Sequence, residues 1–129
     1  MKKLTNAEVV TILRKARRLL NKGWTQKSLA RDKWGHDVND VMSKSACKFC
    51  LTGAVLRATP LNNRDGNFTY NSTYHQIITM MNRTLSFSRI AADNPLFTVI
   101  YFNDKQPRSA RGKQNVIRFV DGLIKTLSR

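Results

Sequence analysis

Acidic residues are scarce in this sequence. The chain of 129 residues has 8 Asp and Glu against 23 Lys and Arg, which gives a formal net charge of +15 and a pI near 10.7. This excess of positive charge predicts a polyanionic partner, such as nucleic acid or the acidic surface of a protein. The few carboxylates are scattered along the chain, so the sequence shows no carboxylate pair typical of acid–base catalysis.

Long hydrophobic runs are missing as well. The longest apolar segment with a single interruption, Leu96 to Phe102, has seven residues including Thr98, whereas a helix that crosses a membrane needs about 20. Residues 1–8 lack the apolar core of a signal peptide. We therefore expect a cytoplasmic protein that does not associate with membranes.

Potential metal ligands are few. Cys47 and Cys50 have Cys-x-x-Cys spacing, but a zinc site needs four ligands, usually from two clusters, and His36 and His75 each stand alone in the sequence. We expect no metal and no other cofactor. In the cytoplasm the two cysteines are expected to be free thiols, with a structural role in the core.

Common catalytic motifs are also absent. The sequence has no Gly-rich phosphate loop, no G-x-S-x-G and no H-E-x-x-H. A nucleophilic cysteine needs a base and an orienting group, and Cys50, His75 and either Asn103 or Asp104 could supply such a set. Because many chains offer such a combination, we predict that the protein is not an enzyme. An activity that depends on Cys50 is kept as an alternative.

The overall composition, 41% hydrophobic and 24% charged, is typical of a globular protein. Without repeats or low-complexity segments, residues 1–129 are expected to form a single domain. The predicted fold is mainly α: a compact bundle of about four helices around a buried central helix. At most a small β-hairpin is expected, near residues 25–38.

The first helix has the clearest signals. Thr5 and Glu8 are spaced as a capping box, and Gly23 provides a C-terminal stop. Its expected buried stripe consists of Val9, Leu13, Ala16 and Leu20.

The central helix is expected over residues 43–58, the densest apolar segment, with Ser43 or Ser45 as its N-cap. Lys44, Lys48 and Thr52 recur every four residues and would form its one narrow polar stripe. A helix that is apolar around most of its circumference packs against several neighbours.

Two further helices are expected in the C-terminal half, one of them after a polar loop that ends near residue 72. A second loop covers residues 86–94, and residues 96–102 fit either a buried strand or a short helix that begins at Pro95. The expected buried residues of the earlier helix are Tyr74, Ile77, Ile78, Met81 and Leu85. The last helix runs from Ala110 to Leu127 and would bury Val116, Phe119, Val120, Leu123 and Leu127.

Residues 24–38 allow two interpretations. In one, Asp32-Lys-Trp-Gly35 is a turn between two short extended segments, because Asp opens turns and Gly adopts positive φ. In the other, the segment is the first part of a helix-turn-helix with its turn at Gly35 and a recognition helix from Val38. The spacing is one residue too long for the second interpretation, which favours the turn.

The basic residues of the first helix, of residues 27–33 and of the last helix are the candidate contacts to a polyanion. Aromatic rings near basic residues, among them Trp24, Trp34 and Tyr101, could stack on bases if they are exposed. The alternative, expected for most of these rings, is a place in the core, as for Trp24, Phe97 and Phe102. The candidate contacts are Arg14, Lys15, Arg18, Lys22, Lys27, Arg31, Lys33, Arg108, Arg111, Lys113 and Arg118.

Four segments together resemble a small uncharacterised domain family known mainly from phage and bacterial genomes. The order and spacing of these segments are similar to the family's pattern over about residues 7 to 127. The family carries no established activity, so the resemblance implies a shared domain and favours the turn interpretation. It also implies that Cys50, rather than Cys47, is the family position. The matching pieces are Gly23-Trp-Thr-Gln26, Ala30-Arg-Asp32 with Gly35, Phe49-Cys-Leu-Thr-Gly-Ala54, and Phe102-Asn-Asp104 with Arg108-Ser109.

From these observations we predict a non-enzymatic, basic binding protein of phage or mobile-element type. Its expected partner is nucleic acid, either DNA or RNA. The alternative is an inhibitor or modulator that binds an acidic surface of a host protein complex, in which case the positive charge would steer association. If the protein is phage-encoded, its expected location is the cytoplasm of the host cell.

Overall fold

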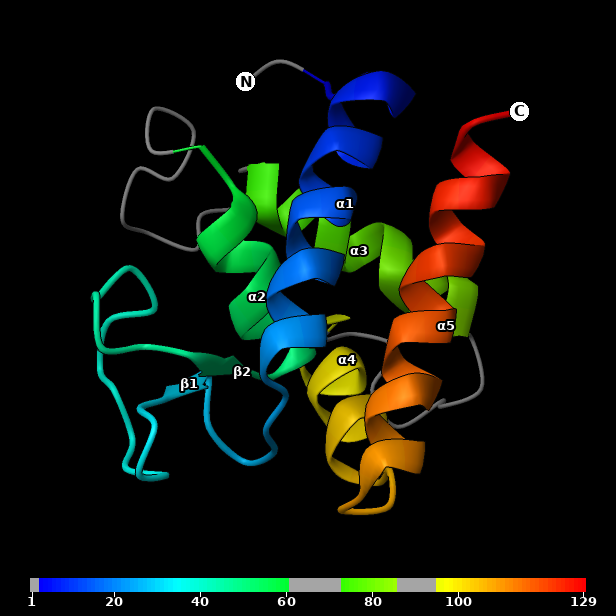
Figure 1. Ribbon diagram of the computed structural model, residues 1–129. Helices are drawn as coiled ribbons and strands as arrows, with labels where there is room; N and C mark the ends of the chain where they lie inside the picture. Colours follow the sequence, from blue (N-terminus) through cyan, green and yellow to red (C-terminus); the bar gives the residue numbers. More distant parts are fainter. Residues whose placement is uncertain (1–2, 61–72, 86–94) are drawn as a thin grey trace.

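The computed structural model describes residues 3–60, 73–85 and 95–129 (Figure 1). These residues form five helices and one two-stranded antiparallel sheet. The mainly helical fold with a buried central helix is therefore as predicted. The loops expected over residues 61–72 and 86–94 lie outside the described residues.

Helices α1 (Asn6–Lys22) and α5 (Ala110–Leu127) lie side by side and run in opposite directions (Figure 1). The bounds of α5 match the prediction. The predicted capping box of α1 is present: Thr5 Oγ1 accepts the Glu8 N–H, and a Glu8 carboxylate oxygen accepts the Thr5 N–H. Arg17 and Asp121 form an ion pair of 2.5 Å between the two helices.

The buried faces of these helices largely follow the predicted spacing. The whole expected stripe of α1 is buried, together with Ile12. In α5, Phe119 and Leu127 are only partly buried, whereas Ile117 lies in the core. The other expected α5 residues are buried: Val116, Val120 and Leu123.

Helix α2 (Leu51–Ala58) is the predicted central helix, because it packs against α1, α3, α4 and the sheet. It is shorter than expected. The prediction that it begins near residue 43 with Ser43 or Ser45 as N-cap is wrong: Cys50, in an extended conformation, is the N-cap, and its sulfur accepts the Gly53 N–H.

The residues before Cys50 do not join the helix because long-range pairing takes up their backbone groups. Strand β2 (Lys48–Phe49) pairs antiparallel with β1 (Ala30–Arg31). On either side of β2, Cys47 donates its N–H to Arg31 and Cys50 donates to Leu29. The expected polar stripe therefore does not form, and Thr52 is fully buried.

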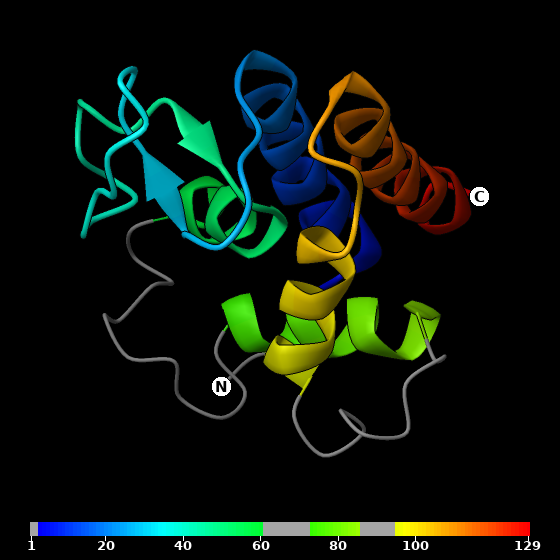
Figure 2. The ribbon, with the colours of Figure 1, turned by 90° about the horizontal axis from the view of Figure 1, so that it is seen from below.

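Helices α3 (Thr73–Leu85) and α4 (Pro95–Asp104) pack against each other, and both contact α2 (Figure 2). Residues 96–102 therefore belong to a helix, not a strand. All five residues expected to be buried in α3 are buried. None of the helices within the described ranges is long and apolar enough to cross a membrane.

The turn interpretation of residues 24–38 is confirmed, and the helix-turn-helix is not formed there. One carboxylate oxygen of Asp32 accepts the N–H groups of Trp34 and His36, both at 2.9 Å. Gly35 has a φ of +88°, which favours glycine. The returning segment makes only an isolated bridge to β1, whose strand partner is β2.

Candidate functional site: a basic cleft

A cleft of about 620 Å³ lies where the end of α1, the small sheet and the start of α5 meet. This volume is within the range of ligand-binding clefts. No Asp or Glu is found among the described residues that line it. We call it the basic cleft, because its lining includes the cationic side chains of Lys27, Arg31, Lys48, Arg108 and Lys113.

The segment after α1 forms one wall of the basic cleft and is fastened to the end of α4. Trp24 donates its indole N–H to the Asn103 side-chain oxygen at 2.8 Å. The Gln26 amide nitrogen lies 2.7 to 3.1 Å from three backbone carbonyl oxygens of residues 103, 104 and 106. The Lys27 N–H donates to a carboxylate oxygen of Asp104. These bonds hold the wall in place without using the charged groups of the cleft.

Lys27 has a φ of +63°, in the left-handed region that residues other than glycine seldom adopt. The bond from its N–H to Asp104 stabilises this conformation. The ammonium group of Lys27 makes no ion pair or hydrogen bond to the described part of the chain. Residues held in sparsely populated backbone conformations cluster at functional sites, which makes Lys27 a candidate contact.

Arg31 lines the basic cleft but is held by the protein itself. Its guanidinium donates to Thr25 Oγ1, the Gly35 carbonyl and the Gln26 carbonyl at 3.0 to 3.2 Å. It also forms a 2.8 Å ion pair with Asp37. We call residues 30–38 the hairpin, because they turn back on themselves through bonds between residues 32 and 36 and between 38 and 30. Because most of its donors are engaged, Arg31 fixes the hairpin against the cleft wall.

The start of α5 forms the opposite wall. Ser109, the N-cap residue, makes no side-chain capping bond, and the first turn of α5 has no acidic residue. The first backbone N–H groups of a helix carry partial positive charge, and Ser109 and Ala110 both line the cleft. Lys113 donates to the carbonyl of Asn21 at 2.6 Å and joins α5 to the end of α1.

Two glycines allow the walls of the cleft to approach closely. A Cβ on Gly23 would overlap the backbone oxygen of Cys47. A Cβ on Gly112 would overlap the carbonyl of Pro107 and press on the ring of Trp24. The cleft therefore depends on backbone contacts that a larger residue would disturb.

The structure brings four of the eleven predicted contacts together in the basic cleft: Lys27, Arg31, Arg108 and Lys113. Lys48, which sequence reasoning missed as a contact, is the fifth cation. The sequence predicts Lys48 within a helix over residues 43–58, whereas its pairing with β1 brings it to the cleft. The remaining predicted contacts do not line the cleft: Arg14, Lys15, Arg18, Lys22, Lys33, Arg111 and Arg118.

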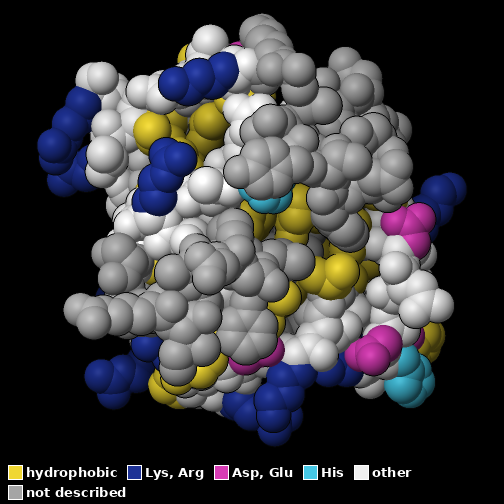
Figure 3. All heavy atoms as spheres, turned by 180° about the vertical axis from the view of Figure 1, so that it is seen from behind, with side chains coloured by type: hydrophobic (Ala, Val, Ile, Leu, Met, Phe, Trp, Pro, Cys, Tyr) yellow, Lys and Arg dark blue, Asp and Glu magenta, His cyan; other side chains and the backbone are white. Residues whose placement is uncertain are grey.

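Positive charge is also found outside the cleft. On the face opposite that of Figure 1, Lys and Arg side chains lie around the margins, and apolar side chains are visible nearer the middle (Figure 3). Arg14, Lys15 and Arg18 are exposed on α1, and Arg118 is exposed on α5. Among the described residues, the basic cleft is thus the place where cations gather around a concave surface.

The environment of Cys50 does not favour nucleophilic chemistry. Its side chain is 5% exposed, and burial raises the pKa of the thiol, although hydrogen bonds from Thr52 and Gly53 act in the opposite direction. A reactive cysteine needs a lowered pKa. Cys47 is exposed, and both thiols are free. The described ranges contain no group of His, Cys, Asp or Glu suited to hold a metal ion.

The fold and the cleft define a small, mainly helical protein with a cationic cleft at the junction of three separate chain segments. The chain matches the model of DUF6197, a family of unknown function, over residues 4–125, and it belongs to that family. Neither the curated proteins nor the solved structures yielded a significant match.

The four segments that carry the resemblance described above are bonded to one another, and three of them contribute residues to the lining of the basic cleft. Trp24 and Gln26 of the first segment bond to the segment that ends α4. Leu51, from the third segment, donates its N–H to Asn103 at 3.1 Å. Arg31, from the second, bonds back to Gln26. Motif residues therefore contribute to the frame of the cleft. Three of its cations lie outside the motif pieces: Lys27 and Lys48 fall between pieces, and Lys113 follows the last one.

Proposed function

We propose that the protein is a non-enzymatic binding protein that engages nucleic acid through its phosphates, with the basic cleft as the principal contact. One observation carries this proposal: five cationic side chains from separate segments converge on one ligand-sized cleft without an acidic residue among its described lining. The net charge of +15 supports it, because such a field steers polyanions toward the protein.

The placement of cations at the start of α5 also favours an anionic ligand. Arg108 precedes the helix and Arg111 lies in its first turn. Positive charges near a helix N-terminus are unfavourable by about 0.3 to 1 kcal/mol each. A phosphate bound beside them would offset this repulsion and would accept hydrogen bonds from the backbone of the first turn.

Three cations of the cleft are available for such a contact. The charged groups of Lys27, Lys48 and Arg108 make no ion pair or hydrogen bond to the described part of the chain. Arg31 and Lys113, in contrast, already bond to the protein. Each phosphate that a cation neutralises lowers the logarithm of the affinity by about 0.7 to 0.9 per logarithmic unit of salt.

Two charge-matched triple variants test the proposal. The cleft variant changes Lys27, Lys48 and Arg108 to Gln, and the control variant changes Arg14, Lys15 and Arg118 to Gln. Each lowers the formal charge of +15 by three. Affinity for a labelled oligonucleotide is measured by fluorescence anisotropy over a salt series. We expect the cleft variant to lose about two to three units of salt slope and the control variant to lose much less.

Equal effects of the two triples would show that net charge, not the cleft, governs binding. Absence of salt-dependent binding by the unmodified protein would overturn the proposal. In that event, a stoichiometric acidic protein retained from nuclease-treated lysate would favour the alternative, an inhibitor or modulator that docks on a host complex.

The proposal also covers the origin of the protein and the compartment in which it acts. The resemblance to domains of phage and bacterial genomes supports a phage or mobile-element origin, with action inside the host cell. The two free thiols are consistent with a reducing cytoplasm.

A further inference from the structure

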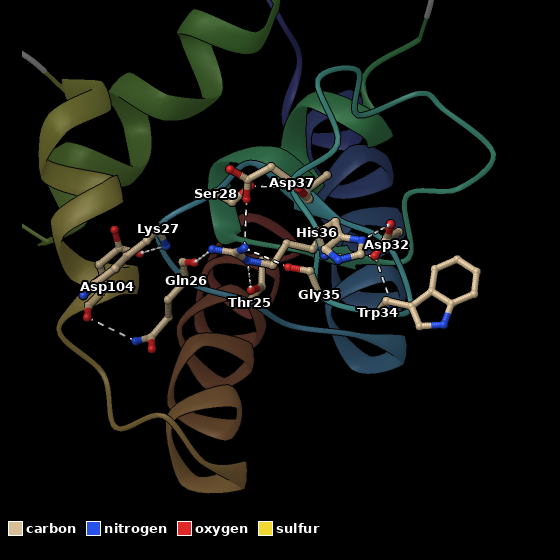
Figure 4. A network of polar contacts seen from close by, with 12 residues as sticks. Thr25, Gln26, Lys27, Ser28, Asp32, Trp34, Gly35, His36, Asp37 and Asp104 are labelled. Carbon is tan, nitrogen blue, oxygen red and sulfur yellow. Dashed lines mark hydrogen bonds and ion pairs between the residues drawn. The ribbon is translucent and has the colours of Figure 1, made fainter.

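Trp34 is the most exposed large hydrophobic side chain in the described part of the protein. It is 71% exposed, compared with 51% for Tyr101 and 37% for Leu29. Figure 4 shows its ring projecting away from the polar network of the hairpin. Packing in the described fold therefore does not explain an indole at this position.

The backbone that carries Trp34 is held in one conformation. Asp32 accepts the N–H groups of Trp34 and His36, and the Gly35 N–H donates to the Asp32 carbonyl at 3.0 Å. Arg31 adds a bond to the Gly35 carbonyl. A ring mounted on a rigid turn loses little conformational entropy when a ligand binds it.

A cation lies beside the Trp34 ring, and the residue that follows Trp34 in the sequence lines the basic cleft. The Lys33 ammonium is 4.5 Å from the centroid of the Trp34 ring. Gly35, the next residue, lines the basic cleft. A strand whose phosphates occupy the cleft and that leaves it past Gly35 would bring a base to the indole and a phosphate to Lys33.

We propose that Trp34 is a base-stacking residue at the edge of the basic cleft and that the bound nucleic acid is single-stranded. This inference rests on the proposed function and specifies its ligand. Single strands present the faces of their bases, which stack on aromatic side chains with little regard to sequence. In a duplex those faces are covered by neighbouring base pairs, so an exposed indole has no partner unless the duplex is opened.

The test compares Trp34→Ala with Tyr101→Ala. Tyr101 is a matched control because it is also an exposed ring near a lysine, with Lys105 5.7 Å from its centroid, but it is not next to a cleft residue. Binding of each protein to a labelled single strand and to the corresponding duplex is measured over a salt series. Circular dichroism verifies that both variants fold.

We expect the unmodified protein to prefer the single strand and Trp34→Ala to weaken that binding about tenfold or more. The salt slope should stay the same, because no phosphate contact of the cleft is removed. Trp34→Phe should recover part of the affinity, and Tyr101→Ala should bind as the unmodified protein does.

The outcomes separate this inference from the proposed function. If Trp34→Ala leaves the salt-dependent binding unchanged, or if the protein prefers the duplex, the stacking role of Trp34 is overturned. The proposed role of the basic cleft in binding phosphates would stand in either case. If the unmodified protein binds neither the single strand nor the duplex in a salt-dependent way, both proposals are overturned.

Discussion

The indole N–H of Trp24 is bonded to the side-chain oxygen of Asn103, 79 positions further along the chain. The same oxygen accepts the N–H of Leu51, and the Asn103 amide group donates to the Thr25 carbonyl and to Asp104. Asn103 is 1% exposed. This one side chain thus joins the cleft wall, the start of α2 and the end of α4.

Asn103→Ala is expected to destabilise the protein by about 2 to 4 kcal/mol, because it leaves several buried polar groups without partners. Urea unfolding followed by circular dichroism measures the loss. Asn39→Ala, at an exposed position, should change stability by less than about 0.5 kcal/mol. A loss at Asn103 no larger than that of the control would contradict the role assigned to this residue.

Gly53→Ala and Gly122→Ala should have opposite effects although both positions are helical. A Cβ at Gly53 would overlap the backbone of Leu29, so we expect a loss of about 2 kcal/mol or more. At Gly122 no atom lies within 4 Å of the added Cβ, and Ala is better than Gly in a helix by about 0.5 to 1 kcal/mol. Thermal unfolding of both variants gives the comparison, and a neutral Gly53→Ala would refute the close contact.

Lys27→Gly should separate stability from binding. Glycine adopts the left-handed conformation of residue 27 without steric penalty, so the free energy of unfolding should rise by up to about 1 kcal/mol. The same change removes a cation of the basic cleft, and oligonucleotide affinity should fall. Urea unfolding and anisotropy on one preparation test both parts. Lys15→Gln, at an exposed position outside the cleft lining, is the control for loss of charge.

The hairpin that carries Trp34 should loosen in acid. The N–H of His36 and, to a smaller extent, that of Trp34 donate to Asp32, and these bonds hold the pKa of that carboxyl below its usual value of 3.8. A lowered pKa in the folded state stabilises the turn above about pH 4, and that stabilisation is lost as the pH falls through the folded-state pKa. The Trp34 and His36 amide resonances report the change. Asp32→Asn should remove this dependence on pH.

The two thiols should differ sharply in reactivity. Cys47 is exposed, whereas Cys50 is buried and burial raises the pKa of its thiol. A disulfide reagent at pH 8 should therefore modify Cys47 rapidly and Cys50 only when the protein unfolds. Mass spectrometry of the native protein gives the count and position of the modified thiol. Rapid modification of native Cys50 would revive a cysteine-dependent activity.

Local sequence signals were enough to predict most helices. The capping box at Thr5 and Glu8 and the apolar spacing of α3 and α5 correctly predicted where these helices lie, because such helices are encoded by residues within a few turns of one another. The turn at Asp32 and Gly35 was predicted for the same reason. The length of α2 was not, since the pairing of β2 with β1 depends on residues 17 or more positions away.

The cleft could not be predicted from the same signals. Its walls come from residues 23–35, residue 48 and residues 108–113, which only the completed fold brings together. The spacing of charges in the sequence therefore gave the candidate cations without distinguishing Lys27, which lines the cleft, from Lys15, which does not. The bonds of Asn103 and Gln26 that assemble the cleft carry no pattern that reveals them in advance.

The antiparallel arrangement of α1 and α5 gives the molecule a polarity. The start of α1 and the end of α5 lie at one end of this helix pair, and the basic cleft lies at the other, where α1 ends and α5 begins (Figure 1). A ligand that occupies the cleft would therefore contact the turn that follows α1 and the first turn of α5, and the opposite ends of both helices would stay clear of it.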